Sequence, residues 1–392
     1  MARFGRTRLL GVTVKRFLVQ AKRHAPAADE SLPEPLRTRY APSVGKLFSQ
    51  KGQTPDQKAK TLQQVAEDAR DLLAVFHDDV AMSKRPSYLA LARAFADHCE
   101  VIEDRVTVRA KSRSDSLQNP SDLDATYDGH KGQGYQVQLA ETCGESEVQL
   151  IVAAVPQTAS EHDAHAVKPI LESLKSQGLL PESLLADTAY GSDENAQLAA
   201  KDGVELVSPV GGPKGEATPD STAETPAETS AMGPLSIDDF AMDERTGQVD
   251  RCPAGRIPLT VACDANGKTT VEMTPEDCGP CSFFAACPMA KRGRTYALEY
   301  TAKQRRLEER RREQSTAAFD QRYSKRSGLE STNGGLKRRL GLGRLRVRGL
   351  KAVSHAVLLR VAGWNVLQAV RSKVLMAKVR AMLAERCLSV GC

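Results

Sequence analysis

One carboxylate stands inside a strongly basic stretch near the end of the chain. Residues 323 to 337 read YSKRSGLESTNGGLK, and the only acid among them is Glu330. On a helix, Tyr323, Arg326 and Glu330 follow at steps of three and four and share one face. The Asn-Gly-Gly after them is expected to end that helix and leave Lys337 just beyond it. Such a carboxylate is either an ordinary solvated helix charge or a group held there to do chemistry on an anionic partner.

A second carboxylate comes where an apolar run ends. Residues 183–195, SLLADTAYGSDEN, predict a short buried strand that ends near Asp187, then a turn and a new helix. Ser192 is the expected N-cap of that helix. Active-site groups commonly follow the strands of an open sheet, but aspartate is also a routine turn residue there. By itself, Asp187 therefore leaves a catalytic and a structural role open.

Several cysteines have the spacing of a metal site. Cys278 and Cys281 are separated by two residues, which lets two thiolates reach one tetrahedral zinc ion. Cys287 and the remote Cys252 could complete a four-sulfur structural site, and Cys263 is a fifth candidate. Free loop cysteines or a redox pair are the alternatives. The odd total of nine cysteines favours the reducing cytoplasm over a disulfide scaffold.

The positive charge of the chain is concentrated in two places. The net charge is +6, and residues 336–351, LKRRLGLGRLRVRGLK, hold seven Lys or Arg and no acid. The first 24 residues are also basic and acid-free. Such patches favour a polyanionic partner, although a solvated charged face is the commoner explanation of any one of them. No apolar run approaches the roughly 20 residues that span a bilayer, so no membrane partner is expected.

The hydrophobic pattern predicts which elements surround these residues. Helices are expected over 59–79, 86–104 and 162–178, the last with Gly178 at its C-cap. Strands are expected at 134–142 and 147–157, forming a hairpin, and at 204–210. Residues from 303 onward are expected to be helical again. Together they indicate an α/β or mixed α+β fold, a mixed sheet with flanking helices.

The spacing Y-(2)-R-(3)-E-(6)-K at residues 323–337 resembles a signature of the DDE transposases of bacterial insertion sequences. Other blocks of the chain resemble that family in the expected order, over about residues 118–370. They are DLDATYDGHKGQGYQVQLAE at 122–141, ADTAYGSDEN at 186–195, the CP-x-G and C-x-x-C segment, and RGLKAV at 348–353 followed by a helix with Trp364 and Asn365. The resemblance implies an RNase H-like fold.

In that family, three carboxylates hold two divalent metal ions, usually Mg²⁺, for in-line displacement at a phosphodiester. The resemblance makes Asp187 the second carboxylate and Glu330 the third. It makes Arg326 and Lys337 contacts to the DNA backbone and Tyr323 a positioning group. It also implies double-stranded DNA as partner, at the element ends and the target, and a homodimer on DNA. The further cations assigned to DNA are Arg338, Arg344, Arg346 and Arg348.

The first carboxylate of the family is not evident in this chain. It should end a strand ahead of the hairpin, and the nearest run before residue 110, EVIEDRVTV, has Asp104 in its middle. Asp122, Asp124 and Asp128 are other candidates for that role, although they resemble a different block of the family. We therefore expect a chain that lacks its N-terminal part, with strand cleavage lost or impaired.

The resulting division has five parts. They are a helical N-terminal region (1–110), the first part of the RNase H-like catalytic domain (111–210), a low-complexity linker (211–234), an insertion with the cysteine cluster (235–300) and the helical last part of the catalytic domain (301–392). A non-catalytic, zinc-stabilised DNA-binding protein or transposase remnant is the alternative, and a nuclease of the same fold is a third. The helices at 59–104 could bind DNA, mediate dimerisation or cover the sheet. A bacterial chain of this kind would act in the cytoplasm, at the nucleoid.

Overall fold

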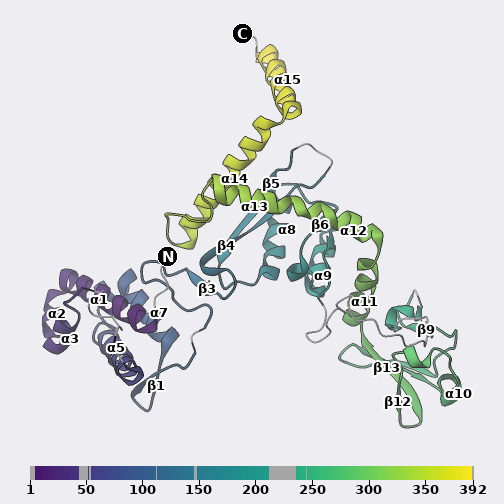
Figure 1. Cartoon of the computed structure of the whole chain (residues 1–392), viewed down its shortest axis with the longest axis horizontal. Helices are drawn as coiled ribbons and strands as arrows, with labels where there is room; N and C mark the ends of the chain where they lie inside the picture. The colour runs from purple at the N-terminus through teal and green to yellow at the C-terminus, as the bar shows by residue number, and fades with distance from the viewer. Residues whose placement is uncertain are drawn as a thin grey trace. The chain divides into compact units, whose positions relative to one another are not determined.

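The computed structural model describes residues 5–43, 52, 54–111, 113–144, 148–211, 235–243 and 245–390, the last six of them by backbone alone. The chain forms two units, one of Met1–His162 with Glu330–Cys392 and the other of Asp163–Leu329. Figure 1 shows their helices and strands. The predicted linker at 211–234 lies outside the described residues except for Gly211. The five-part division stays a prediction.

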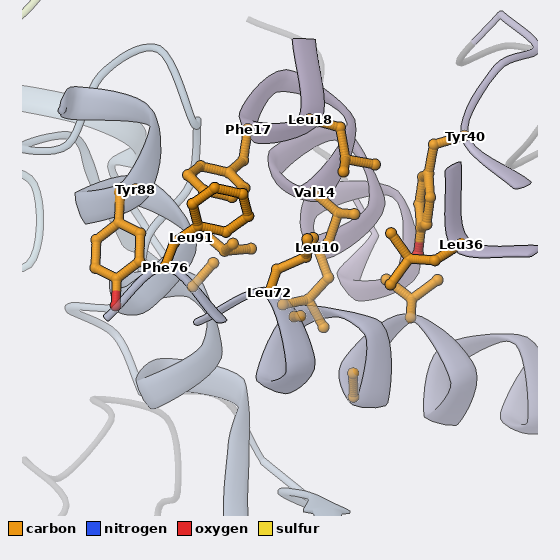
Figure 2. Close-up of a cluster of buried hydrophobic side chains, with 14 of the residues drawn as sticks. Leu10, Val14, Phe17, Leu18, Leu36, Tyr40, Leu72, Phe76, Tyr88 and Leu91 are labelled. Atoms are coloured by element: carbon orange, nitrogen blue, oxygen red, sulfur yellow. The ribbon is translucent and has the colours of Figure 1, made fainter. Parts of the chain in front are cut away.

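Helices build the first part of the first unit. They are α1 (Arg6–His24), α2 (Pro26–Ser31), α3 (Glu34–Arg39), α5 (Pro55–Val75), α6 (Val80–Ser83) and α7 (Pro86–His98). Leu10, Val14 and Phe17 are completely or almost completely buried on one side of α1, at the helical spacing of three and four. They meet Leu72 and Phe76, as Figure 2 shows. This helical region therefore has an apolar core of its own.

A hairpin replaces the last part of the helix predicted over 86–104. Helix α7 ends at His98, and β1 (Cys99–Ile102) pairs with β2 (Arg105–Val108) in antiparallel fashion. The turn uses Glu103 and Asp104 in the left-handed region, at φ 47° and 61°. The helix prediction was wrong here because Val101 and Ile102 are β-branched and a tight hairpin turn follows them. Asp104 is thus a turn residue.

The predicted hairpin at 134–157 is confirmed in the same unit. Strands β3 (Thr126–Asp128), β4 (Gly132–Glu141) and β5 (Ile151–Thr158) form one antiparallel sheet in that order. Helix α14 (Leu350–Arg371) packs against β5. Their shared core contains Ile151, Val353 and Val357. The amide of Asn365 on α14 bonds both backbone groups of Ile151, at 2.9 and 2.8 Å, and this fixes the helix along the strand.

The Asn-Gly-Gly sequence does not end a helix. Helix α13 (Gly328–Arg339) continues through it, so Lys337 lies on the helix and not beyond it. A Cβ added to Gly335 would lie 2.1 Å from the Trp364 ring of α14. The prediction was wrong because this glycine serves close packing between two helices, and not a C-cap. After α14, the chain bends at Ser372 and continues as α15 (Lys373–Val390).

The second unit begins with a parallel strand pair. Its elements are η1 (Asp163–Ala166), α8 (Val167–Ser176), β6 (Ser183–Leu185), η2 (Thr188–Tyr190), α9 (Asp193–Lys201) and β7 (Glu205–Val207). Strands β6 and β7 are parallel, with α9 between them in sequence. Gly178 follows α8 at φ 67°, and Ser192 caps α9 by accepting a bond from Asn195 N–H at 3.2 Å. The predicted strand, turn and helix around Asp187 are therefore confirmed.

The cysteine-bearing segment has its own small sheet. Strands β10 (Thr260–Cys263), β11 (Lys268–Met273), β13 (Thr295–Thr301) and β12 (Ala290–Arg292) pair in that order. The shorter elements around them are η3 (Ile237–Asp239), β8 (Ala241–Met242), β9 (Val249–Arg251), α10 (Pro275–Cys278) and η4 (Phe284–Ala286). Buried residues such as Phe240, Val271 and Met273 form its core. The chain leaves this segment through α11 (Ala302–Gln314), α12 (Ala317–Tyr323) and η5 (Ser324–Ser327).

The fold class is mixed α and β, as predicted. The three-stranded antiparallel sheet and the β6–β7 pair belong to different units, and the RNase H-like arrangement stays a prediction. A search of the described residues found no helix with the length and apolar character needed to span a membrane.

Candidate active site and nucleic-acid interface

Asp187 lies two residues after β6, where the sequence predicted it. One carboxylate oxygen accepts the Ala189 N–H at 3.0 Å and caps η2. The other accepts from Arg326 Nη2 at 3.2 Å, and the side chain is 42% exposed. The Ser208 hydroxyl donates to the Asp187 carbonyl oxygen at 2.6 Å, which ties this residue to the end of β7. Both oxygens of this carboxylate are therefore engaged.

Arg326 contacts both Asp187 and Tyr323 within the second unit. The Arg326 guanidinium carbon lies 6.0 Å from the centre of the Tyr323 ring, and that ring stacks on Phe319 at 5.5 Å. Arg326 pairs with the candidate carboxylate in this structure, and its predicted contact to the DNA backbone stays a prediction. The ring stack fixes the tyrosine, and the tyrosine face supports the guanidinium.

The single helix face predicted for Tyr323, Arg326 and Glu330 is wrong. Tyr323 ends α12, Arg326 lies in the 3₁₀ turn η5, and Glu330 is in the first turn of α13. The hydroxyls of Ser324 and Ser327 bond back to carbonyls three residues earlier, at 2.9 and 3.0 Å. Such bonds favour the tighter turn, so the three side chains do not follow one α-helical repeat.

Glu330 is exposed, and no side-chain hydrogen bond or ion pair joins it to another described residue. Its place in the first turn of α13 is favourable, because the helix dipole stabilises acids there. Asp187 belongs to the second unit and Glu330 to the first. Their joint role as second and third carboxylates stays a prediction.

The basic segment, residues 336–351, alternates between core and solvent. Leu336 is fully buried, and Leu340, Leu342 and Leu345 pack against the same core as Trp364. The cations between them are exposed and form no ion pair within the described residues: Lys337, Arg338, Arg344, Arg346 and Arg348. The leucines thus hold a row of cations at the surface, and such a row suits the phosphates of a nucleic acid.

Aspartates hold the backbone of the basic segment. Asp122 is 2% exposed, and one of its oxygens accepts bonds from the Tyr135 hydroxyl and the Gly349 N–H. Asp124 accepts the Leu350 N–H at 2.7 Å, at the start of α14. Asp128 accepts two backbone N–H groups in the turn before β4, which lowers its pKa. All three candidates for the first carboxylate therefore make structural bonds.

With this geometry in place, the comparison with protein families is informative. Residues 251–370 match the family model described as a transposase DDE domain. The matched range contains the predicted signature from Tyr323 to Lys337, the basic segment and the four candidate cysteine ligands. Asp187 lies outside it. No curated protein and no solved structure matches the chain.

The DDE-domain match supports a transposase function in general and implies DNA as the partner. Domains of this family generally use divalent metal ions. Over the ranges of the chain that are described, however, no group of three or more His, Cys, Asp or Glu side chains is arranged to hold a metal. The side chains as they stand do not form a ready site for Mg²⁺.

The four predicted zinc ligands line one small cavity. Cys252, Cys278, Cys281 and Cys287 surround a volume of about 20 Å³, while Cys263 is exposed on β10 and does not line it. Burial, together with the charges of the other three cysteines, raises the pKa of the Cys278 thiol to about 11. The Cys281 N–H donates to the Cys278 carbonyl at 3.3 Å in the turn between them. These cysteines line one cavity, but the search of the described residues that found no metal-holding group covers them too, and zinc binding stays a prediction.

Sequence reasoning missed Glu141 at the end of β4. Its carboxylate accepts the Thr332 hydroxyl at 2.7 Å, and burial raises its pKa. The signal was in the alternation of β4, because Glu141 follows Tyr135, Val137 and Leu139 at steps of two and so lies on their core-facing side. It is a carboxylate inside the first unit that touches α13, the helix of Glu330.

Proposed function

We propose that this chain is an insertion-sequence transposase that binds DNA through the basic segment and has impaired strand cleavage. The observation that carries the proposal is the DDE-domain match over 251–370 together with the exposed, unpaired cations inside it. The impairment is inferred from the carboxylates, since every aspartate candidate for the first catalytic position makes structural bonds. The RNase H-like catalytic domain and the five-part division belong to this proposal.

The DNA-binding part rests on the electrostatics of the basic segment. Its cations face solvent, so they can replace the counterions condensed on a DNA duplex. Each phosphate contact adds about 0.9 to the slope of log affinity against log salt concentration. We further propose a homodimer on DNA, because Leu359, Val366 and Val370 form an exposed apolar stripe along α14.

The catalytic part of the proposal requires that the Asp187 carboxylate be released from its present partners. When bound, divalent metal ions would supply the charge that stabilises a phosphodiester displacement. In this structure Arg326 occupies one oxygen of Asp187 and the η2 cap occupies the other. The arginine holds the carboxylate in place and neutralises it. A DNA phosphate that draws Arg326 away would free that oxygen, so we assign Arg326 to both partners in turn.

The decisive experiment incubates the purified chain with labelled DNA carrying the ends of its own element, with Mg²⁺ or Mn²⁺. We expect binding without efficient nicking at the 3′ ends. Efficient, metal-dependent nicking would overturn the impairment, and absence of DNA binding would overturn the proposed function itself.

Two substitutions separate binding from catalysis. Glu330→Gln should leave DNA affinity unchanged, because the residue is exposed and outside the row of cations. Asp187→Asn releases Arg326 from its ion pair, so it should not weaken DNA binding. If either variant abolishes a nicking activity that the wild type shows, the carboxylate is catalytic and the active site is complete.

The second candidate function is a DNA-binding protein without catalysis that is stabilised by zinc. The common cavity of the four cysteines favours it. Zinc content and thermal melting would be measured for the wild type and for Cys281→Ser. Cys263→Ser is the matched control, because that thiol lies outside the cavity. We expect bound zinc that is lost in Cys281→Ser alone, whereas zinc-free protein with chelator-insensitive melting would contradict the site.

A further inference from the structure

A second cationic feature lies in the first unit, away from the basic segment in sequence. A cavity of about 430 Å³ opens between α1 and the start of α7. Its walls include Val12, Lys15, Arg16 and Val19 of α1, with Arg85 and Ser87 opposite. The α1 residues follow the spacing of three and four on a face separate from the core residues Val14 and Phe17. The first acid-free stretch of the sequence therefore builds a defined pocket.

The cations of this pocket have no acidic partner. Lys15 donates to the carbonyls of Tyr40 and Ala41 at 2.8 and 3.2 Å and also to that of Pro42, which engages all three ammonium donors, so Lys15 contributes its charge and not a free donor. Arg16 donates to the Ser121 hydroxyl, and Arg85 Nε donates to the Ala81 carbonyl at 3.1 Å. None of the three forms an ion pair with Asp or Glu in the part of the chain that the structure describes.

The cations in and around this pocket also repel one another. Burial lowers the pKa of Arg16, and the charge of Arg348 in the basic segment lowers it further. Desolvation lowers the pKa of His24, and the charges of Arg85 and Arg23 add to the shift. Such mutual repulsion is unfavourable unless an anion lies between the cations.

The pocket also presents neutral donors. Arg85 is the N-cap of α7 and supplies no capping bond, so the first N–H groups of this 13-residue helix lack a side-chain acceptor. The Ser87 hydroxyl oxygen is buried and has no hydrogen-bond partner among the residues that the structure describes. A helix N-terminus with cations and a free hydroxyl suits a ligand that only accepts hydrogen bonds, such as a phosphate group.

We propose that this pocket binds a backbone phosphate of DNA. The identity of the polyanion rests on the proposed function, whereas the pocket rests on its own geometry. The volume exceeds that of a bare phosphate and leaves room for the adjoining deoxyribose. Val12 and Val19 provide the apolar wall that a sugar would contact. DNA is favoured over a free nucleotide because the same unit also carries the exposed cations of the basic segment.

The test measures binding of a labelled duplex by the full chain at several salt concentrations. Arg85→Gln should lower the salt slope by about one. Ser87→Ala should weaken binding several-fold with the slope unchanged, and because its hydroxyl has no partner, the fold should stay intact. Lys22→Gln is the control, an exposed α1 cation outside the pocket. Circular dichroism and melting confirm folding of each variant.

Equal slopes for Arg85→Gln and Lys22→Gln would overturn the proposal. A second result would also overturn it. If inorganic phosphate or a free nucleotide raised the melting temperature of the wild type but not of Arg85→Gln, and the two proteins bound DNA equally well, the pocket would serve small phosphates and not DNA. If substitution of cations in the basic segment lowered the salt slope of DNA binding but Arg85→Gln did not, this pocket would be refuted and the proposed function would stand. A wild type that binds no DNA would refute the proposed function instead.

Discussion

Two arginine-rich segments of this chain look alike in sequence and behave differently in the structure. Helix α11 reads AKQRRLEERRREQ, and the basic segment at 336–351 reads LKRRLGLGRLRVRGLK. In α11 the cations bond within the second unit: Lys303 with Glu194, Arg306 with Asp193, Arg310 with the carbonyls of Gly191 and Ser208, and Arg312 with Asp238 and Asp239. In the basic segment the cations are exposed and unpaired within the described residues.

The two segments differ in whether the fold gives their cations acidic partners. In the second unit, cations of α11 pair with acids, of which Asp193 is buried, so much of their charge is balanced within that unit. In the first unit, Asp122 and Asp124 bond the backbone of residues 349 and 350 and leave the cationic side chains free. A run of arginines therefore favours a nucleic-acid interface where the fold offers those arginines no acidic partner.

The largest effect on stability should come from breaking an α11 pair. Asp193 is 5% exposed, and Arg306 meets it with two bonds at 2.9 and 2.7 Å. Arg306→Met keeps the apolar stem but leaves a buried carboxylate alone. We expect the unfolding free energy of the second unit to fall by about 2 kcal/mol, because the arginine itself is partly exposed. Urea unfolding measures it.

Arg305→Met is the matched control for that variant. Arg305 bonds the Gly247 carbonyl alone, at 3.1 Å, so its loss should cost under about 1 kcal/mol. DNA affinity should be unchanged in both variants. Equal stability losses would remove the distinction between the pair and an ordinary surface contact.

The opposite result is expected from the basic segment. The triple variant Arg338→Gln, Arg344→Gln and Arg346→Gln should lower the salt slope of DNA binding by about three. Each change should alter stability by no more than about 0.5 kcal/mol, since these side chains face solvent. Binding anisotropy across a salt series and urea unfolding measure the two effects. If the triple variant lost stability while the salt slope of DNA binding stayed unchanged, these cations would serve the fold and not the nucleic acid.

The local elements were predictable because their signals lie close together in sequence. The alternation of 134–157 gave the β4–β5 hairpin, and the Ser192 cap with its two acids gave the start of α9. Prediction failed where a distant residue decides the local structure. Gly335 looked like a helix end, but the Trp364 ring requires a glycine there, and no local pattern reveals that contact.

The site followed the same rule. Asp187 was found because an apolar strand precedes it, and the four cysteines because their spacing is a known ligand pattern. The pairing of Arg326 with Asp187 joins residues 139 positions apart, which no spacing could indicate. For the same reason, the structural bonds of Asp122 and Asp124 to residues 349 and 350 were invisible in the sequence.

A smaller effect should come from the acids that hold the basic segment. Asp124 accepts the Leu350 N–H at the start of α14, so Asp124→Ala removes a cap. The cost should be about 1 kcal/mol, typical of a lost capping bond. The cations should stay available, so the salt slope of DNA binding should be unchanged while thermal melting drops. Asp124→Asn, which keeps an acceptor, is the control and should lose less.

The smallest effect is expected at Glu141, an acid that forms no ion pair with a cation within the described residues. Burial raises the pKa of Glu141, while the Thr332 hydroxyl bond opposes that shift. The folded state therefore holds its proton to higher pH than the unfolded state, and stability falls as the pH rises through that window. Glu141→Gln removes the titration and still accepts the bond.

Glu141→Gln should therefore match the wild type near pH 4, where both side chains are neutral, and exceed it at neutral pH by less than about 1 kcal/mol. Thermal melting across the pH series measures the difference. Thr332→Val is the companion variant, because loss of the donor raises the pKa of Glu141 further and makes the fall with pH steeper. A constant difference between Glu141→Gln and wild type at every pH would show that Glu141 titrates normally. Glu141 would then be no less stable as a charged group in the fold than in the unfolded chain. The contrast between paired and unpaired charged groups would not apply to it.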